Sequence, residues 1–491
     1  MTSPAEMESG KKFFGHPRGL STLFFTEMWE RFSYYGMRGI LVLYLVNQVS
    51  GMGMSDAKAG AIYGMYTAGV YLLALPGGWI ADRIIGQRRA VFVGGIIIAM
   101  GHFSMAMPSS VTFFLGLMLI VVGTGLLKPN VSAIVGDLYP EGGPRRDAGF
   151  SLFYMGINVG ALAGPLIVGF LGENINWHLG FSAAGVGMVL GLIQYKMGLG
   201  HLGDAGHIRE SQVSGIPQAR RQLMIGIGVT VGILALIMVL QSLGVLSLEL
   251  ETVAQATGVI IVALAVSYFA YVLGFGGLDR SEKKRVVFIF FLFVGSALFW
   301  SGFEQAGSSL NLFAERLTDR NVFGFEAPAS WLQSINPLFI IILAPVAGAL
   351  WVKLGDRDPS IPVKFGAGLT LLGIGFFVLA WGATYTDGGN LVSPAWLVVT
   401  YFLHTTGELA LSPVGLSSVT KLSPPRLVGQ MMGIWFMGTA LGNLIAGLVG
   451  GRMETLPVTQ IFVTVGMFVL GSGLLFFVFS RPIKNLASDV R

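Results

Sequence analysis

The chain has 491 residues, of which 53% are hydrophobic and only 12% are charged, and its mean hydropathy is +0.70. In soluble domains about a quarter of the residues are charged. The much lower charged fraction of this chain argues against a soluble multidomain protein. A net charge of +5 then reflects Lys and Arg in cytoplasmic loops rather than nucleic-acid binding, and the absence of cysteine excludes disulfides and thiolate metal sites.

The chain begins with a polar, basic stretch at 1–19 that contains no short apolar run ending in a small-residue cleavage site. We expect a cytoplasmic N-terminal segment there. Fourteen apolar segments follow, in lengths that match the roughly 20 residues needed to cross a hydrocarbon core. In chain order they are Leu20–Val49, Ala59–Ala81, Ala90–Met107, Val111–Val135, Gly149–Gly172, Leu179–Gly198, Leu223–Ser247, Val253–Gly276, Val286–Asn311, Trp331–Val352, Phe365–Trp381, Pro394–Ser418, Leu427–Gly450 and Val458–Phe479.

Two of these segments differ from the rest. Leu223–Ser247 and Val253–Gly276 contain almost no polar side chains, which predicts helices that face lipid. Without them, six segments lie on each side of the polar stretch Gly200–Arg221. The predicted domains are an N-terminal six-helix bundle at 20–199, a cytoplasmic linker with two inserted helices at 200–284, a C-terminal six-helix bundle at 285–480 and a cytoplasmic tail at 481–491.

The distribution of Lys and Arg predicts the orientation. With the N-terminus placed inside, 24 of the 31 basic residues lie on the inner side, and the outer loops hold only Lys58, Arg316, Arg320 and Arg452. An even number of spans with both termini cytoplasmic satisfies this count. Two six-helix halves joined by a cytoplasmic connector suggest the major facilitator architecture, in which the halves rock about a midplane site.

The loop after the second segment supports this architecture. Gly77–Arg89, GGWIADRIIGQRR, resembles the facilitator loop motif, a small-residue helix end followed by Asp-Arg and a basic turn. The glycines permit close helix contact, and Asp82 can pair with a basic partner at a helix end. A generic basic loop on the inner side is the alternative. A weaker echo, Gly348–Trp351 followed by Lys353 and Arg357, lies at the equivalent place in the second half.

Charged residues inside the apolar segments mark the candidate site. A charge at the bilayer centre costs about 2.5–3.5 kcal/mol on insertion scales, so such residues normally pair or line a water-filled pathway. Seven of them lie well inside: Glu27, Glu30, Arg31, Arg38, Lys128, Glu304 and Glu408. Four acids and three bases leave a net charge of −1, which one bound proton neutralises. A zwitterionic solute would find both a cation and an anion here.

The first segment carries these charges on one side. Glu27, Glu30, Arg31, Tyr34 and Arg38 fall within an arc of about 100° of a helix. They would face a polar interior. A structural ladder of salt bridges to neighbouring helices is the alternative interpretation, although two acids and two bases on one span exceed what packing requires.

Other polar residues lie beside prolines, as in the non-ideal helices around transporter cavities. Lys128 precedes Pro129 and Asn336 precedes Pro337, and each proline removes one backbone hydrogen bond. The ninth segment predicts a continuous helix with one polar face that comprises Trp300, Glu304, Gly307, Ser308 and Asn311. The twelfth segment carries a row with a spacing of four residues, followed by a proline: His404, Glu408 and Ser412. On its own, His404 fits a satisfied interior histidine better than a proton carrier.

The stretch Glu27–Gly36, EMWERFSYYG, matches the E-x-x-E-R-F-x-Y-Y-G motif of the proton-dependent oligopeptide transporter family. Gly77–Gly101 and Phe150–Leu162 resemble two further signatures of that family, in the same order. The resemblance extends over the whole chain and includes the two inserted helices typical of bacterial members. Animal members use a histidine in the second helix where this chain has Ala61–Gly64, AIYG, so proton binding would rest on carboxylates.

The resemblance implies roles for individual residues. The proton-coupling residues are Glu27, Glu30, Arg31, Lys128 and Glu304. The substrate-binding residues are Tyr34, Arg38, Tyr71, Lys128, Asn158, Trp300, Asn336, Glu408, Ser412 and Trp435. Arg38 and Lys128 would hold the peptide carboxylate, and Glu304 could pair with Arg38. Asn158, Asn336 and Glu408 would hold the amino end.

The sequence thus predicts an all-α membrane protein that acts as a proton-coupled symporter and imports di- and tripeptides by alternating access. We expect a multi-pass protein of the bacterial cytoplasmic (inner) membrane that works as a monomer among lipids, driven by the proton gradient without cofactor, metal or nucleic acid. The alternative is a facilitator-type transporter of a drug or nitrate. No nucleophile elbow or phosphate loop is present, so an enzyme is not expected.

Overall fold

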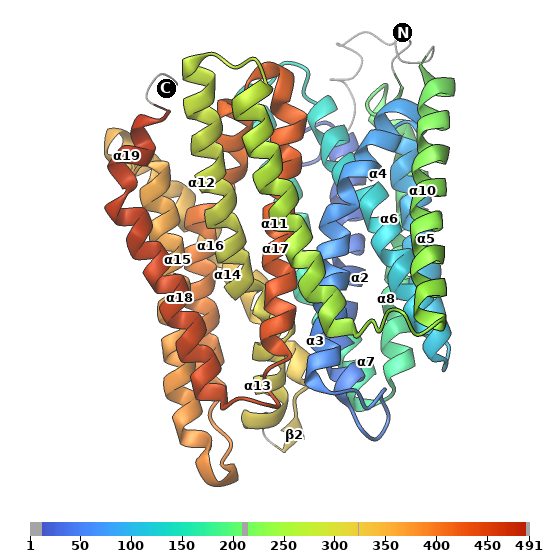
Figure 1. Ribbon diagram of the computed structural model, residues 1–491, viewed down its shortest axis with the longest axis vertical. Coiled ribbons are helices and arrows are strands. Elements are labelled where there is room, and N and C mark those ends of the chain that lie inside the picture. The colour runs from blue at the N-terminus through green and yellow to red at the C-terminus, as the bar shows by residue number, and fades with distance from the viewer. Residues whose placement is uncertain (1–11, 209–214, 323, 488–491) are drawn as a thin grey trace. The chain divides into compact units, whose positions relative to one another are not determined.

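The computed structural model describes residues 12–208, 215–322 and 324–487, which are almost entirely helical (Figure 1). Three basic residues of the orientation count, Lys11, Arg209 and Arg491, lie outside the described residues, as do parts of the predicted N-terminal segment, linker and tail. The strands of the described part form one short hairpin, in which β1 (Asn321–Val322) pairs antiparallel with β2 (Phe325–Glu326).

The helices follow the predicted apolar segments closely. In chain order they are α2 (Gly19–Val46), α3 (Asp56–Leu72), α4 (Ala74–Ile80), α5 (Gln87–Met105), α6 (Ser110–Asp137), α7 (Gly143–Asn174), α8 (Trp177–Gly198), α10 (Ile216–Ser242), α11 (Leu250–Phe275), α12 (Arg280–Phe303), α13 (Ser309–Leu317), α14 (Ile335–Leu354), α15 (Ile361–Ala383), α16 (Ala395–Leu422), α17 (Val428–Gly450), α18 (Val458–Val478) and α19 (Ser480–Asn485). Short π or 3-10 turns adjoin them: η1 (Ala81–Ile85), η2 (Leu199–Leu202), η3 (Glu304–Gly307), η4 (Ala329–Ser334), η5 (Gly355–Arg357), η6 (Thr384–Gly389) and η7 (Pro425–Leu427).

Within the described residues, 11 helical stretches are long and apolar enough to cross a membrane. Three further long helices, α2, α5 and α16, coincide with the remaining predicted segments, and each contains charged residues. The total of fourteen crossings and the cytoplasmic placement of both termini stay predictions.

Packing divides the chain into two units, and each is described by itself. Unit 1 comprises Met1–Gly36, Leu72–Gly164 and His178–Val253, and unit 2 comprises Met37–Tyr71, Pro165–Trp177 and Ala254–Arg491. The divisions fall inside α2, at the end of α3, inside α7 and near the starts of α8 and α11. Unit 2 therefore combines pieces of the first half of the sequence with the second half, and the predicted six-helix bundles in chain order stay a prediction.

Glycines set the helix spacing in unit 1. A Cβ on Gly94 of α5 would lie 2.6 Å from the carbonyl oxygen of Gly123 in α6, and a Cβ on Gly77 of α4 would lie 2.0 Å from that of Gly125. Only glycine permits such close approach of two backbones. The small residues of the loop motif thus serve the packing of α4 on α6, as the sequence indicated.

The two inserted helices differ in their surroundings. Along α10, which lies at the edge of unit 1 in Figure 1, only Ala219 is buried, as expected for a helix that faces lipid. The same expectation is wrong for one face of α11, which buries Ile261, Ala265 and Phe269. The Phe269 ring packs 5.2 Å from the ring of Phe290 on α12, so α11 is anchored to unit 2.

In unit 2, α15 packs against both α16 and α18 (Figure 1), again through glycines. A Cβ on Gly368 would lie 2.9 Å from the carbonyl oxygen of Gly407 in α16, and one on Gly366 would lie 3.1 Å from that of Gly473 in α18. The close α15–α16 contact fixes the helix that carries Glu408.

The ninth predicted segment is not one continuous helix. α12 gives way to the 3-10 turn η3 at Glu304, and Ser308 has non-helical backbone angles of φ −123° and ψ −97° before α13 begins. The predicted common face from Trp300 to Asn311 is therefore wrong. Asn311 instead donates to the carbonyl oxygen of Gly39 in α2 at 2.8 Å. The break leaves Glu304 at the end of α12.

Candidate functional site

The first group of buried charges lies in unit 1, on α2. Arg31 Nε lies 3.1 Å from Glu27 Oε1 and also contacts Glu30 Oε2, and all three side chains are at most 3% exposed. Arg31 Cζ lies 5.1 Å from the centre of the Tyr34 ring. Three residues of the predicted polar face, Glu27, Glu30 and Arg31, thus pair with one another within α2.

Lys128 adds a second cation to this unit. It lies on α6 and interacts electrostatically with Glu27. We name Glu27, Glu30, Arg31 and Lys128 the α2 group. Its two acids and two bases give a formal charge of zero when all are ionised.

The second group lies in unit 2 and centres on Arg38 and Glu304. Arg38 Nη1 lies 2.8 Å from Glu304 Oε2, and both side chains are 5% exposed. The Tyr63 hydroxyl on α3 donates to the backbone oxygen of Glu304 at 3.1 Å. A Cβ on Gly307 would lie 2.3 Å from that hydroxyl oxygen, so the glycine lets Tyr63 reach the turn. The expected Arg38–Glu304 pair is confirmed.

Glu408 on α16 completes the second group. Asn336, in the first turn of α14, donates from Nδ2 to Thr405 Oγ1 at 2.8 Å and to Glu408 Oε2 at 3.3 Å. No Lys or Arg among the described residues forms an ion pair with Glu408, and the Glu304 carboxylate repels it. Arg38, Glu304 and Glu408, which we name the unit 2 group, therefore carry a formal charge of −1 when all are ionised.

Two tryptophans and a serine lie in the same unit. A Cβ on Gly442 would lie 2.5 Å from Trp300 Cβ, and a Cβ on Gly415 would lie 2.2 Å from the Trp435 ring, so glycines make room for both indoles. In the described part of the chain the buried Trp300 Nε1 and Ser412 Oγ have no hydrogen-bond partner. A polar solute could satisfy both atoms.

The remaining predicted residues divide between the units. Tyr71 lies in unit 2, whereas Tyr34, Lys128 and Asn158 lie in unit 1. Asn158 is buried and donates from Nδ2 to the carbonyl oxygen of Tyr154 at 2.8 Å, one turn earlier on α7. The carboxylate site that the resemblance implies takes one cation from each unit, and it stays a prediction.

A third set of contacts lies at the end of unit 2 that the predicted orientation puts outside. Asp56 accepts from Arg316 Nη1 at 2.7 Å and Nη2 at 2.8 Å. Glu173 accepts from the backbone nitrogens of Ala329 at 2.7 Å and Ser330 at 3.1 Å, and from Ser330 Oγ at 2.5 Å. We name these residues the outer cluster. It joins α3 to α13 and α7 to η4.

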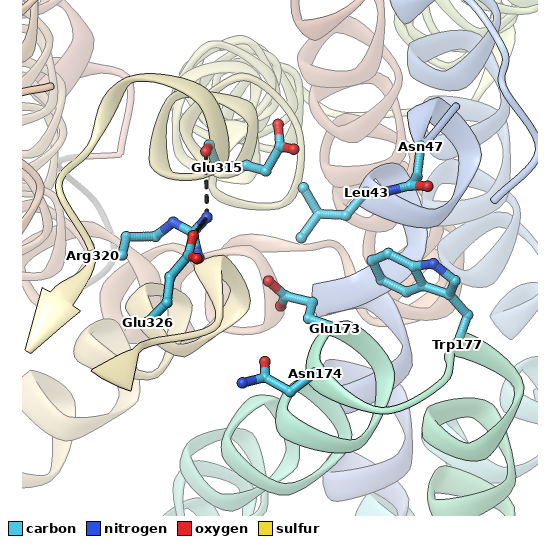
Figure 2. Close-up of a pocket in the computed structure, with 8 residues that line it drawn as sticks. All are labelled: Leu43, Asn47, Glu173, Asn174, Trp177, Glu315, Arg320 and Glu326. Carbon is cyan, nitrogen blue, oxygen red and sulfur yellow. Dashed lines mark hydrogen bonds and ion pairs between the residues drawn. The ribbon is translucent and has the colours of Figure 1, made fainter. Parts of the chain in front are cut away.

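A cavity of about 330 Å³ lies beside the outer cluster (Figure 2). It is lined by Leu43, Asn47, Glu173, Asn174, Trp177, Glu315, Arg320 and Glu326. Arg320 Nη2 lies 2.8 Å from Glu326 Oε1, and Arg320 Nη1 donates to the carbonyl oxygen of Ala327 at 2.5 Å. None of the predicted site residues lines this cavity, and across the described ranges no three His, Asp or Glu side chains gather as they would around a metal ion.

Comparison with known proteins decides the family. The sequence profile of the POT family matches residues 88–469. The chain belongs to the POT family. It is 41% identical to the peptide transporter YePEPT of Yersinia enterocolitica subsp. palearctica serotype O:3 (strain YE-P4), over 100% of this chain and 99% of the relative. It is 37% identical to a di-/tripeptide transporter of Lactococcus lactis subsp. cremoris, over 98% of each chain.

A solved structure agrees with this assignment. The crystal structure of a peptide transporter POT in complex with sulfate superposes with a TM-score of 0.90 at 42% identity, and the match covers 99% of both chains. The expected major facilitator fold is confirmed. As a POT-family member the chain is a transporter rather than an enzyme, and a multi-pass protein of the bacterial inner membrane.

One expectation for the loop motif of this POT-family chain is wrong. Asp82 makes no ion pair within the described residues, and its hydrogen-bond partner is Gln87 Nε2 at 3.4 Å. The basic part of the motif makes the stronger contact, since Arg88 Nε donates to the carbonyl oxygen of Ala205 at 2.5 Å. The loop is therefore tied to the linker through its arginine.

Sequence reasoning also missed three hydrogen-bonding residues. Tyr63 lies in a stretch that reads as apolar, and Glu173 lies just past the end of a predicted segment, so neither was counted among the buried polar groups. Thr405 precedes Glu408 by three residues, a spacing that puts both on one helical face. That spacing could have identified Thr405 as a neighbour of the acid.

Proposed function

We propose that this chain is a proton-coupled symporter that imports di- and tripeptides by alternating access. The observation that carries the proposal is the charge of −1 on the unit 2 group, in which Glu408 has an amide rather than a cation as its partner. A proton or a substrate ammonium would neutralise this group. Two relatives are named peptide transporters, which supports a peptide as the substrate and does not favour a drug or nitrate.

The Arg38–Glu304 pair is assigned to proton coupling. Protonation of Glu304 removes one charge of the pair and weakens its hold on Arg38. Arg38 can then form a charge-assisted hydrogen bond with the substrate carboxylate, which is about twice as strong as a neutral one. The proton binds Glu304 and the substrate carboxylate binds Arg38, and each of them weakens the Arg38–Glu304 pair. Binding of either one therefore favours binding of the other.

Glu408 and Asn336 are assigned to the amino end of the peptide. An ammonium placed at Glu408 would supply the cation that this buried carboxylate lacks within the described residues. The other walls of the substrate site are assigned to Tyr34, Tyr71, Lys128, Asn158, Trp300, Ser412 and Trp435.

The α2 group is assigned to coupling on the other unit. Arg31 contacts both Glu27 and Glu30, so protonation of one acid would leave the arginine paired with the other. Lys128, which interacts with Glu27, would then be available to the substrate carboxylate. The peptide carboxylate and the proton would thus both act on the charges of the α2 group.

Alternating access requires the outer cluster to open. Its hydrogen bonds link helices from the first half of the sequence to helices from the second half inside unit 2. A substrate that enters from the side assigned as outer would need these bonds to break. The Asp56–Arg316 and Glu173–Ser330 contacts would therefore re-form in each cycle.

The test is uptake of labelled dialanine by the purified protein in liposomes. An inward proton gradient should drive accumulation above the external concentration, and a protonophore should abolish it. Liposomes without protein give the background. Absence of gradient-driven accumulation, or accumulation that the protonophore does not change, would contradict the proposal.

A further inference from the structure

Thr405 differs from other hydroxyl residues of α16 in its hydrogen bonding. Four of these donate to the carbonyl oxygen four residues earlier, at 2.6–2.8 Å: Thr400, Thr406, Ser418 and Thr420. Among the bonds of the described residues Thr405 has none of this kind, and its Oγ1 instead accepts from Asn336 Nδ2. The hydroxyl thus serves a contact between α16 and α14 rather than its own helix.

The same amide nitrogen bonds Glu408 as well. A primary amide has two hydrogens on nitrogen, which suffice for one bond to Thr405 and one to Glu408. These two bonds fix the plane of the Asn336 amide. The opposite orientation would turn the amide oxygen toward an ionised carboxylate, which only accepts hydrogen bonds, and the two oxygens would repel each other.

The arrangement leaves the carbonyl side of Asn336 for another donor. Both side-chain hydrogen bonds of Asn336 in the described part of the chain use Nδ2, so Oδ1 points away from Thr405 and Glu408. Thr405 itself is fully buried, at 0% exposure, whereas Asn336 is only half-buried. A solute could therefore reach Asn336 while Thr405 stays behind it.

We propose that Thr405 is a positioning residue that holds the Asn336 amide with its oxygen turned toward the substrate ammonium. This inference rests on the proposed function, in which Asn336 and Glu408 hold the amino end of the peptide. Thr405 does not touch the substrate. It acts through Asn336, and its effect is confined to ligands that carry an amino group.

The experiment uses a matched pair of ligands. Dialanine and its des-amino analogue, N-propanoyl-alanine, differ only in the amino group, and each is measured as an inhibitor of labelled dialanine exchange in liposomes. The variants are Thr405→Val, which keeps the shape and removes the hydroxyl, Thr405→Ser, which keeps the hydroxyl, and Thr405→Ala as a second deletion. Thr406→Val is the control, because Thr406 is half-buried and its hydroxyl bonds only its own helix.

Thr405→Val and Thr405→Ala should weaken dialanine binding about fivefold, the effect of one lost hydrogen bond, and leave the des-amino analogue unchanged. Thr405→Ser and Thr406→Val should behave as wild type toward both ligands. Equal weakening of both ligands, or of neither, by Thr405→Val would overturn the role of Thr405. If the wild-type protein does not distinguish the two ligands, the proposed amino-end site fails as well, and the role of Thr405 with it.

Discussion

Arg38 and Glu304 form a buried ion pair at 2.8 Å although they come from the first and ninth apolar segments of the sequence. Both belong to unit 2, because α2 packs with the second half of the chain from Met37 onward. Removing one partner of such a pair leaves an uncompensated charge and typically costs about 3–5 kcal/mol. The pair is therefore suited to a role in which protonation of the acid changes what the arginine binds.

Glu304→Gln should abolish gradient-driven accumulation of dialanine, since the amide mimics a permanently protonated acid. Exchange of labelled for unlabelled dialanine without a gradient should partly survive, because it needs no net proton movement. Glu249→Gln, at an exposed position between α10 and α11, is the matched control and should transport as wild type. A normal pH dependence of driven uptake in Glu304→Gln would remove Glu304 from the coupling mechanism.

Arg31→Lys should also lose driven uptake although it keeps the charge. Arg31 Nε lies 3.1 Å from Glu27 and also contacts Glu30, and a planar guanidinium can serve two carboxylates at once. A lysine ammonium is a point charge that would favour one acid and change the balance between them. Full accumulation by Arg31→Lys, measured in the same liposomes, would show that the shared contact is not needed.

The positions of the helices can largely be predicted from the sequence, whereas the hydrogen bonds between helices cannot. Long apolar segments predict helices wherever they occur, so α2 begins at Gly19, one residue from the predicted start. At the break after Glu304 the chain makes a tertiary bond, in which Ser308 Oγ donates to the Ala446 carbonyl oxygen at 2.9 Å. No pattern within the ninth segment contains that partner.

The candidate site divides in the same way. The charged residues stand out because a charge inside an apolar segment is costly, and the Arg38–Glu304 pair was expected from the family resemblance. Neutral hydroxyls such as those of Tyr63 and Thr405 have no comparable free-energy cost inside an apolar segment, so they do not stand out in the sequence. Their importance lies in which backbone oxygen or amide they meet, and that is decided by the packing of α3 on η3 and of α16 on α14.

Glu173→Ala should loosen the outer cluster. The carboxylate accepts from the backbone nitrogens of Ala329 and Ser330, and each buried donor left without a partner costs about 1–3 kcal/mol. Hydrogen exchange at the start of η4 should therefore accelerate about tenfold or more. Glu249→Ala, at the exposed position between α10 and α11, is the control. Unchanged protection of these two amides would show that Glu173 does not hold η4.

A histidine before α2 should give the protein a pH-dependent stability. His16 Nδ1 lies 2.9 Å from the Tyr139 hydroxyl oxygen. Burial, and then the charge of Arg145, lower the pKa of His16 below its usual 6.5. Burial also raises the pKa of Tyr139 to about 12, so the phenol stays protonated across this pH range.

The direction of this pH dependence follows from proton binding at His16. The unfolded chain binds a proton at His16 more readily than the folded protein, so stability rises with pH through this range. The contribution is fully present above about pH 6.5 and is lost as the pH falls toward the lower pKa of the folded state. Thermal unfolding at pH 7.5 and 5.5 should show a smaller difference in His16→Gln than in wild type. The exposed His207→Gln should match wild type, and an identical pH dependence in His16→Gln would refute the assignment.

The most direct measurement is a competition series against labelled dialanine uptake driven by a proton gradient. The competitors are dialanine, its N-acetylated form, its C-terminal amide and free alanine. If Arg38 holds the carboxylate and Glu408 the amine, dialanine should compete far better than either blocked form, because each block removes a charge-assisted contact and leaves a buried charge without its partner. Equal competition by the acetylated and amidated forms would contradict recognition of peptide termini, and with it the assignment of this chain as a peptide symporter.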